Sequence, residues 1–185
     1  MSEPAGNERE MMEALADLAK VSVSNLKKLF SSPPAGKTWG EIKDGLSRGE
    51  NLKAICGVSD EYMEGAYAEA RGRLEREDFT GAKDAFASLC LYDPQAPKHW
   101  GGLAKSCEGL KLHHEAADCY KMAALATGGS EPLPYLCMGY CHLAAGERPE
   151  AREALEMGME IADPNDIAHR PLIRQMEQLL SACGN

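Results

Sequence analysis

The chain has 185 residues, of which 44% are hydrophobic and 26% are charged, and its formal net charge is −9. This length is enough for one domain with a core, or for a domain with an added arm. The negative charge argues against nucleic acid as a partner, because affinity for nucleic acid comes from Lys and Arg side chains that neutralise phosphates. We therefore expect a soluble globular protein that does not bind nucleic acid.

The composition also indicates a cellular compartment. Residues 1–10 contain no apolar run, so we expect no signal peptide. No apolar run approaches the roughly 18 residues of a membrane-spanning helix, and we expect no membrane contact. The seven cysteines are odd in number, and several occupy apolar positions of expected helices. This pattern favours reduced thiols in a cytoplasmic protein over a disulfide framework.

Residues 1–36 are expected to form an N-terminal helical arm and a linker. Apolar residues such as Leu15, Leu18 and Leu26 recur near one stripe of a helix predicted over residues 8–30. A Ser-Ser-Pro-Pro-Ala-Gly stretch then interrupts any helix. Because an amphipathic helix must bury its apolar face, we expect the arm to contact a second copy of the chain in a homodimer, or to fold back on its own domain.

Residues 37–62 are expected to form short lead-in helices. Thr38 and Glu41 have the spacing of a capping box, which predicts a helix start. Leu52 begins a second short apolar pattern. Ser59 is a favourable N-cap residue, and two carboxylates follow it where the helix dipole favours negative charge. A longer helix is therefore predicted to start near Ser59.

The rest of the chain carries an internal repeat of 34 or 35 residues. Ala82, Ala116 and Ala151 share one phase of this repeat. The period, with small residues at two fixed places and an aromatic residue between them, is typical of tetratricopeptide repeats, which are pairs of antiparallel helices. The small residues are expected where two helices cross, since only Gly or Ala lets the backbones approach so closely. The matching residues are Ala70, Ala104 and Gly139, twelve positions before each alanine, and Phe86, Tyr120 and Leu155, four positions after it.

We therefore predict an all-α fold, a tetratricopeptide-repeat solenoid of three helix hairpins. The repeats are expected over residues 63–96, 97–130 and 132–165, so that the solenoid covers residues 63–165. Residues 166–185 are expected to form a C-terminal capping helix. A solenoid needs such a cap, because its last repeat otherwise leaves an apolar face in water.

The first helix of a tetratricopeptide unit turns its positions two, five, nine and twelve toward a concave groove. Here these positions mix aromatic, aliphatic and charged side chains, so the groove suits an extended peptide with a few apolar anchors. The alternative is that some of these side chains pack against the N-terminal or C-terminal helices. The predicted peptide-binding residues are Glu64, Tyr67, Arg71 and Leu74 in the first repeat, Lys98, Gly101, Lys105 and Glu108 in the second, and Leu133, Leu136, Tyr140 and Leu143 in the third.

The sequence predicts no enzyme, no metal site and no cofactor. It contains no phosphate-binding loop, no nucleophile elbow and no His-Glu-x-x-His motif. Cys137 and Cys141 lie four residues apart beside His142, but zinc needs four converging ligands and the chain has no Cys-x-x-Cys pair. We expect Cys141 to be a small buried apolar residue, and His99 to be exposed to solvent or to cap a helix.

The repeats resemble a particular family, the class II chaperones of bacterial type III secretion. The resemblance rests on Leu89 to Asp93 in the first repeat, Gly102 to Ala104 in the second and Gly139 to Cys141 in the third, and it covers residues 40–165. It implies a cytoplasmic bacterial chaperone that holds hydrophobic translocator proteins before export. The client segment implied by the family has the form Pro-x-Leu-x-x-Pro. The resemblance also permits an AraC-type transcription activator as a partner, and a homodimer through the N-terminal region.

The chain departs from this family in its first repeat, and the sequence also leaves other functions as alternatives. The family usually shows several aromatic residues along the first repeat, whereas here Tyr67 keeps one and Arg71 and Leu74 replace others. A co-chaperone that grips the C-terminal carboxylate of a heat-shock protein needs Lys or Arg together with Asn. Lys98 and Lys105 supply charge with Arg71, but no Asn occurs in the repeats before Asn165. A scaffold that binds another protein's peptide tail is the remaining alternative.

Overall fold

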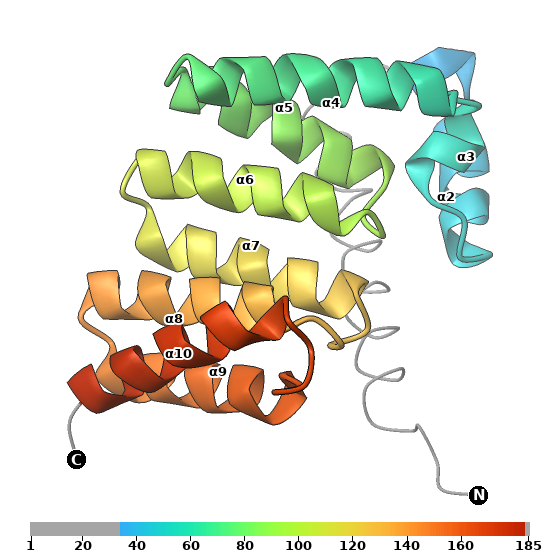
Figure 1. The fold of residues 1–185 in the computed structure, drawn as a ribbon. Helices are drawn as coiled ribbons and strands as arrows, with labels where there is room; N and C mark the ends of the chain where they lie inside the picture. Colours follow the sequence, from blue (N-terminus) through green and yellow to red (C-terminus); the bar gives the residue numbers. More distant parts are fainter. Residues whose placement is uncertain (1–33, 184–185) are drawn as a thin grey trace, which may run out of the picture.

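The computed structural model describes residues 34–183, and every regular element in that part of the chain is helical (Figure 1). The predicted arm helix over residues 8–30 lies outside the described residues. None of the described helices is long and apolar enough to cross a membrane. A 3-10 turn, η1 (Pro34–Gly36), is followed by α2 (Trp39–Ser47), α3 (Leu52–Cys56), α4 (Asp60–Glu75), α5 (Phe79–Tyr92), α6 (Pro97–Gly109), α7 (His113–Ala126), α8 (Pro132–Ala145), α9 (Arg148–Ile161) and α10 (His169–Ala182).

Side-chain hydrogen bonds cap the N-termini of α2 and α4. The Thr38 hydroxyl accepts from the Glu41 backbone N–H at 3.2 Å, and the Thr38 backbone N–H donates to the Glu41 carboxylate at 2.7 Å. These reciprocal bonds confirm the predicted capping box of α2. The Ser59 hydroxyl accepts from the Tyr62 N–H at 3.2 Å. Helix α4 therefore begins directly after Ser59, ahead of the repeat boundary predicted at residue 63.

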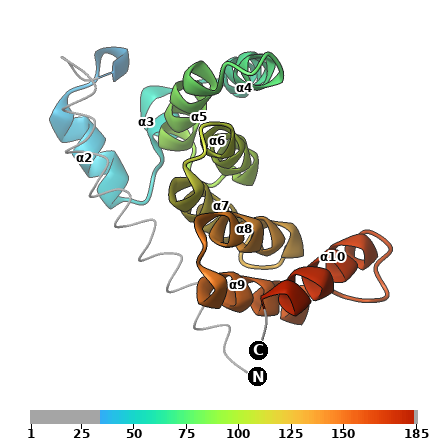
Figure 2. The same cartoon turned by 90° about the vertical axis from the view of Figure 1, so that its left-hand side faces the viewer.

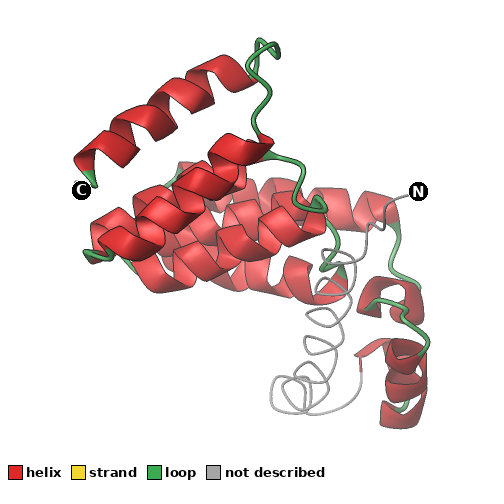
Figure 3. Ribbon diagram, turned by 90° about the horizontal axis from the view of Figure 1, so that it is seen from below, coloured by secondary structure: helices red, strands yellow, loops and turns green. Residues whose placement is uncertain are grey.

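Helices α4 to α9 form three consecutive hairpins that stack in two layers (Figure 1). Figure 2, seen nearly along the helix axes, places α4, α6 and α8 in one layer and α5, α7 and α9 in the other. Helix α3 packs against α5 at one end of the stack. Helix α10 packs against α8 and α9 at the other end, as seen from below in Figure 3. The predicted all-α solenoid of helix hairpins is confirmed.

The small residues of the repeat lie in the core, as the sequence predicts. A Cβ atom on Gly139 would lie 2.6 Å from the side chain of Leu155, which is closer than packed carbon atoms come. Only glycine therefore fits where α8 crosses α9. The repeat residues with no exposed surface are Ala70, Ala82, Ala104, Ala116 and Ala151, together with Phe86 and Leu155.

Helix α10 buries the apolar end of the stack. Its Met176 has no exposed surface and packs with Leu136 and Leu155 from the last hairpin. A Cβ atom on Gly158 would lie 2.7 Å from the Met176 sulfur, so this glycine lets α10 approach α9 closely. The contact covers apolar surface that the third hairpin would otherwise leave in water.

Candidate functional site

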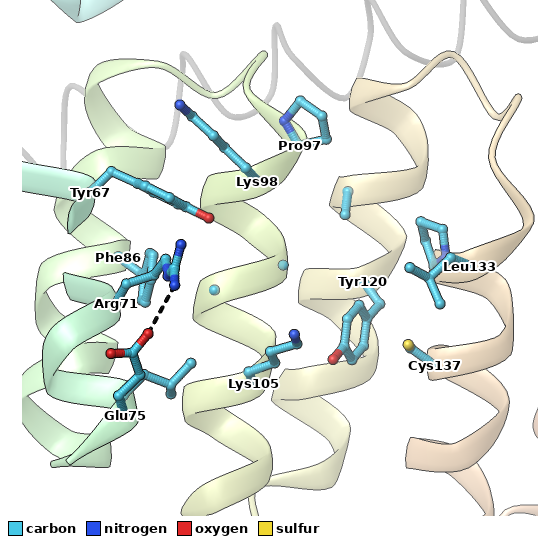
Figure 4. Close-up of a pocket in the computed structure, with 15 residues that line it drawn as sticks. Tyr67, Arg71, Glu75, Phe86, Pro97, Lys98, Lys105, Tyr120, Leu133 and Cys137 are labelled. Atoms are coloured by element: carbon cyan, nitrogen blue, oxygen red, sulfur yellow. Dashed lines mark hydrogen bonds and ion pairs between the residues drawn. The ribbon is translucent and has the colours of Figure 1, made fainter. Parts of the chain in front are cut away.

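A groove of about 780 Å³ lies on the layer formed by α4, α6 and α8 (Figure 4). Its volume falls within the roughly 300–1,000 Å³ that is usual for ligand sites. Residues from five consecutive helices line it. They are Tyr67, Arg71, Leu74 and Glu75 of α4, Phe86 of α5, Pro97, Lys98, Gly101, Gly102 and Lys105 of α6, Tyr120 and Ala123 of α7, and Leu133, Pro134 and Cys137 of α8.

The ring of Phe86 forms part of the groove floor, because α5 places it directly beneath α6. A Cβ atom on Gly102 would lie 2.2 Å from this ring, so the α6 backbone rests on the ring itself. At Gly101 the situation is the opposite, since a Cβ atom there would meet no atom within 4 Å. Gly102 therefore lets the ring pack against α6, and Gly101 adds no side chain to the groove at its own position.

Tyr67 of α4 forms an aromatic wall of the groove. Its ring meets the Phe86 ring edge to face, with centroids 5.8 Å apart and an interplanar angle of 73°. The Lys98 ammonium lies 4.7 Å from the centroid of the Tyr67 ring, and the His99 ring lies 5.9 Å away. Edge-to-face and cation–π contacts of this kind are favourable and directional. They hold Tyr67 as a defined surface against which a ligand can pack.

His99 is buried, so the expectation that it is exposed to solvent is wrong. The alternative, that it caps a helix, agrees with its contact to Asp93, which is the C-cap residue of α5. His99 is 2% exposed, and its Nδ1 lies 3.2 Å from the Asp93 carbonyl oxygen. Burial lowers the pKa of His99, so the neutral imidazole is favoured, with Nδ1–H donating to that carbonyl. The indole N–H of the neighbouring Trp100 donates to the Pro94 carbonyl at 2.7 Å. Both rings thus fix the start of α6 to the loop before it.

The charged side chains of the groove differ in how they are paired. Arg71 donates to the Glu75 carboxylate at 2.9 Å, one turn along α4. Lys98 forms an ion pair with Glu64 on the neighbouring helix. Lys105 is exposed and has no hydrogen-bond or ion-pair partner among residues 34–183. The groove therefore combines apolar surface with one free cation within the described part of the chain.

Most of the predicted peptide-binding residues line this groove. The structure brings together residues from all three repeats, and Glu64 reaches the groove through its ion pair with Lys98. Those that line it are Tyr67, Arg71, Leu74, Lys98, Gly101, Lys105 and Leu133.

In the third repeat, two predicted leucines do not reach the groove. Leu136 is 2% exposed and packs with Met176 and Leu155, and Leu143 packs against the same cluster. Placing Leu136 and Leu143 in the groove is therefore wrong. The physical reason is that α10 lies against α8 and buries the side of that helix on which both leucines lie.

Glu108 and Tyr140 lie outside the groove lining. Glu108 accepts a weak hydrogen bond from the Cys141 thiol at 3.9 Å, and Tyr140 is 47% exposed. Cys141 itself is buried, as predicted. Burial raises the pKa of Cys141 to about 12, so its thiol is neutral at pH 7 and behaves as a small apolar side chain.

Several lining residues were missed because they follow from packing between repeats. Phe86 and Tyr120 belong to second helices, which the repeat pattern assigns to the core. Phe86 reaches the groove floor because Gly102 of α6 lies against its ring, and this glycine was the available signal in the sequence. The missed residues are Glu75, Phe86, Pro97, Gly102, Tyr120, Ala123, Pro134 and Cys137.

A stack of helix hairpins with a groove on the layer of first helices defines a tetratricopeptide-repeat solenoid, and relatives of this class are known. No family model matches the chain. Chaperone protein SicA from Salmonella typhimurium is 29% identical over 137 residues, which cover 71% of this chain and 79% of SicA.

Solved structures extend this likeness to the fold. One of them is the type III secretion chaperone SycD from Yersinia enterocolitica, in complex with a peptide of the translocator YopD. It superposes on this chain with a TM-score of 0.63 at 22% identity, and the match covers 68% of this chain and 95% of SycD. PcrH, a Pseudomonas aeruginosa protein, in complex with the chaperone binding region of PopD, gives a TM-score of 0.63 at 24% identity over 69% of this chain and 94% of PcrH. The chain is thus a homologue of chaperone protein SicA, and it shares the tetratricopeptide fold of SycD and PcrH.

The two neighbouring glycines of α6 give a sharp test of the groove floor. Gly102→Ala places a methyl group against the buried Phe86 ring and should lower the free energy of unfolding by about 1–3 kcal/mol. Gly101→Ala meets open space and gains helix propensity, so it should raise stability by up to about 1 kcal/mol. Urea denaturation followed by circular dichroism measures both. Equal stability of the two variants would contradict the contact between Phe86 and the α6 backbone.

Proposed function

We propose that this chain is a cytoplasmic chaperone of a bacterial type III secretion system, and that it binds hydrophobic translocator proteins through the groove. An extended segment of the client lies across α4, α6 and α8. While the segment is held, the membrane-active parts of the client are kept from associating with one another. The homology to SicA and the solved complexes of SycD and PcrH with translocator segments support this proposal.

The observation that carries the proposal is apolar surface that the fold leaves open in the groove. Leu133 of α8 lines the groove while 51% exposed, and Tyr67 of α4 presents a ring that its neighbours already orient. Between these side chains, Gly101 contributes no side chain of its own. We propose the part of the groove over Gly101, with Tyr67 on one side and Leu133 on the other, as a recess for one aliphatic side chain of a ligand.

A client segment of the form Pro-x-Leu-x-x-Pro fits such a recess. The prolines preset an extended backbone, so the segment loses less conformational freedom on binding. Its leucine packs over Gly101 between Tyr67 and Leu133. Burying one leucine contributes about 1.5–3 kcal/mol, which is roughly one to two decades in affinity.

The partners implied by the resemblance complete the proposal. We propose a homodimer formed through the apolar stripe of residues 11–30, because an amphipathic helix needs a surface on which to bury its face. These residues lie outside the described part of the chain. Binding of an AraC-type transcription activator, which the family resemblance permits, stays a prediction.

Leu133→Ala tests the recess without disturbing the core, because Leu133 is half exposed. The variant should bind a dye-labelled Ser-Pro-Ser-Leu-Ser-Ser-Pro-Ser peptide about tenfold more weakly, since a wall of the leucine recess is lost. Its melting curve should match that of the wild type. Fluorescence anisotropy measures the affinity.

Matched controls separate the recess from general surface effects. Ile167→Ala removes an aliphatic side chain that is 79% exposed and outside the groove, and it should bind as the wild type does. Tyr67→Ala should weaken binding, while Tyr62→Ala on the same helix should not, because Tyr62 does not line the groove. Wild-type affinity in both Leu133→Ala and Tyr67→Ala would rule out the groove as the client site.

The dimer proposal is tested by the mass of the full chain and of a shortened chain that begins at Lys37. We expect light scattering to give the mass of a dimer for the full chain and of a monomer for the shortened one. An unchanged dimer after removal of residues 1–36 would exclude the arm as the dimer contact.

A further inference from the structure

The groove is basic, although the chain as a whole is acidic. Asp and Glu number 29 and Lys and Arg number 20 in the full sequence. In the groove this ratio is reversed, because Arg71, Lys98 and Lys105 stand against Glu75 in the lining and Glu64, which pairs with Lys98. A ligand with negative charge is therefore favoured at this surface over the rest of the described molecule.

Lys105 is the cation that the fold leaves for a ligand. Arg71 is held by Glu75, and Lys98 is held by Glu64 while its ammonium also lies over the Tyr67 ring. Lys105 has no hydrogen bond or ion pair with any described residue.

The nearest acid further along α6 does not neutralise Lys105. Glu108 lies three residues beyond it, but the Glu108 carboxylate accepts from the Tyr120 hydroxyl and from the Cys141 thiol. Figure 4 shows the Lys105 side chain lying between the Arg71–Glu75 pair on one side and Tyr120 on the other. Its ammonium thus stands in the groove, flanked by groups that are already engaged.

Lys105 is also within reach of the proposed leucine recess. It lies four residues after Gly101 on α6, which is about 6 Å along the helix axis. An extended chain covers this distance in about two residues. A side chain near the client leucine can therefore reach the Lys105 ammonium.

Building on the proposed function, we infer that the client segment carries an acidic side chain within about two positions of its leucine, and that this carboxylate binds Lys105. The ion pair selects among segments that share the prolines and the leucine, because a neutral segment leaves the ammonium without a partner. A C-terminal carboxylate has the same chemistry. We assign the role to a side chain, because the repeats before Asn165 hold no Asn that could help to clamp a chain end.

The test compares amidated peptides on the full-length protein by fluorescence anisotropy. The parent is Ser-Pro-Ser-Leu-Ser-Ser-Pro-Ser, and three versions each replace one serine between the prolines by Asp. At about 50 mM salt we expect at least one Asp peptide to bind about five- to tenfold more tightly than the parent. The advantage should shrink at about 0.5 M salt, because the groove is open to solvent.

Variants of the protein test whether the tighter binding of the Asp peptide depends on Lys105. Lys105→Gln should remove the advantage of the Asp peptide, and Lys105→Arg should keep it. Lys121→Gln is the matched control, since Lys121 is an exposed lysine of α7 outside the groove lining. It makes the same change in net charge and should keep the advantage.

The outcomes separate the inference from the proposed function. Binding of the parent with no gain from any Asp peptide, or a gain that survives in Lys105→Gln, overturns the inference alone. If affinity rises only when the parent peptide has a free C-terminal carboxylate, the carboxylate that binds Lys105 is not a side chain, and that part of the inference is overturned. Failure of every peptide to bind the wild type contradicts the proposed function, and the inference falls with it.

Discussion

The ring of Phe86 packs against the backbone of α6 at Gly102, and this contact joins the core of the solenoid to its groove. Phe86 has no exposed surface, so its burial contributes about 1.5–3 kcal/mol to the stability of the first two hairpins. The same ring forms part of the groove floor and supports Tyr67 edge to face. Stability of the stack and shape of the site thus depend on one close approach, which only glycine permits.

The same arrangement recurs along the stack. Leu155 packs against Gly139 where α9 meets α8, and Met176 packs against Gly158 where α10 meets α9. Each junction places a large apolar side chain on a helix that carries a glycine, so neighbouring helices approach closely. The last junction also limits the groove, because α10 buries the side of α8 that carries Leu136. The groove is thereby confined to the region between α4 and the first turns of α8.

Sequence periodicity is enough to predict the hairpins, because the small residues that allow helices to cross recur at a fixed spacing. Local caps such as Thr38 with Glu41 are likewise encoded within a few residues. The position of α10 on α8 is not encoded in the repeat, so Leu136 and Leu143 were assigned to the wrong side. The burial of His99 depends on the Asp93 carbonyl in the preceding loop, which no periodic pattern reveals. Likewise, the repeat period alone does not show that Phe86 and Tyr120 reach the groove from second helices.

The central claim is that a client segment lies on the face of α4, α6 and α8, and nuclear magnetic resonance tests it most directly. Isotope-labelled full-length protein is titrated with the Ser-Pro-Ser-Leu-Ser-Ser-Pro-Ser peptide, and the shift of each backbone amide signal is followed. We expect the largest shifts at Tyr67, Gly101, Gly102 and Leu133, with little change at Ala87, which is exposed on α5 outside the groove. Largest shifts on α10, or on α5 and α9 away from the groove, would contradict the account.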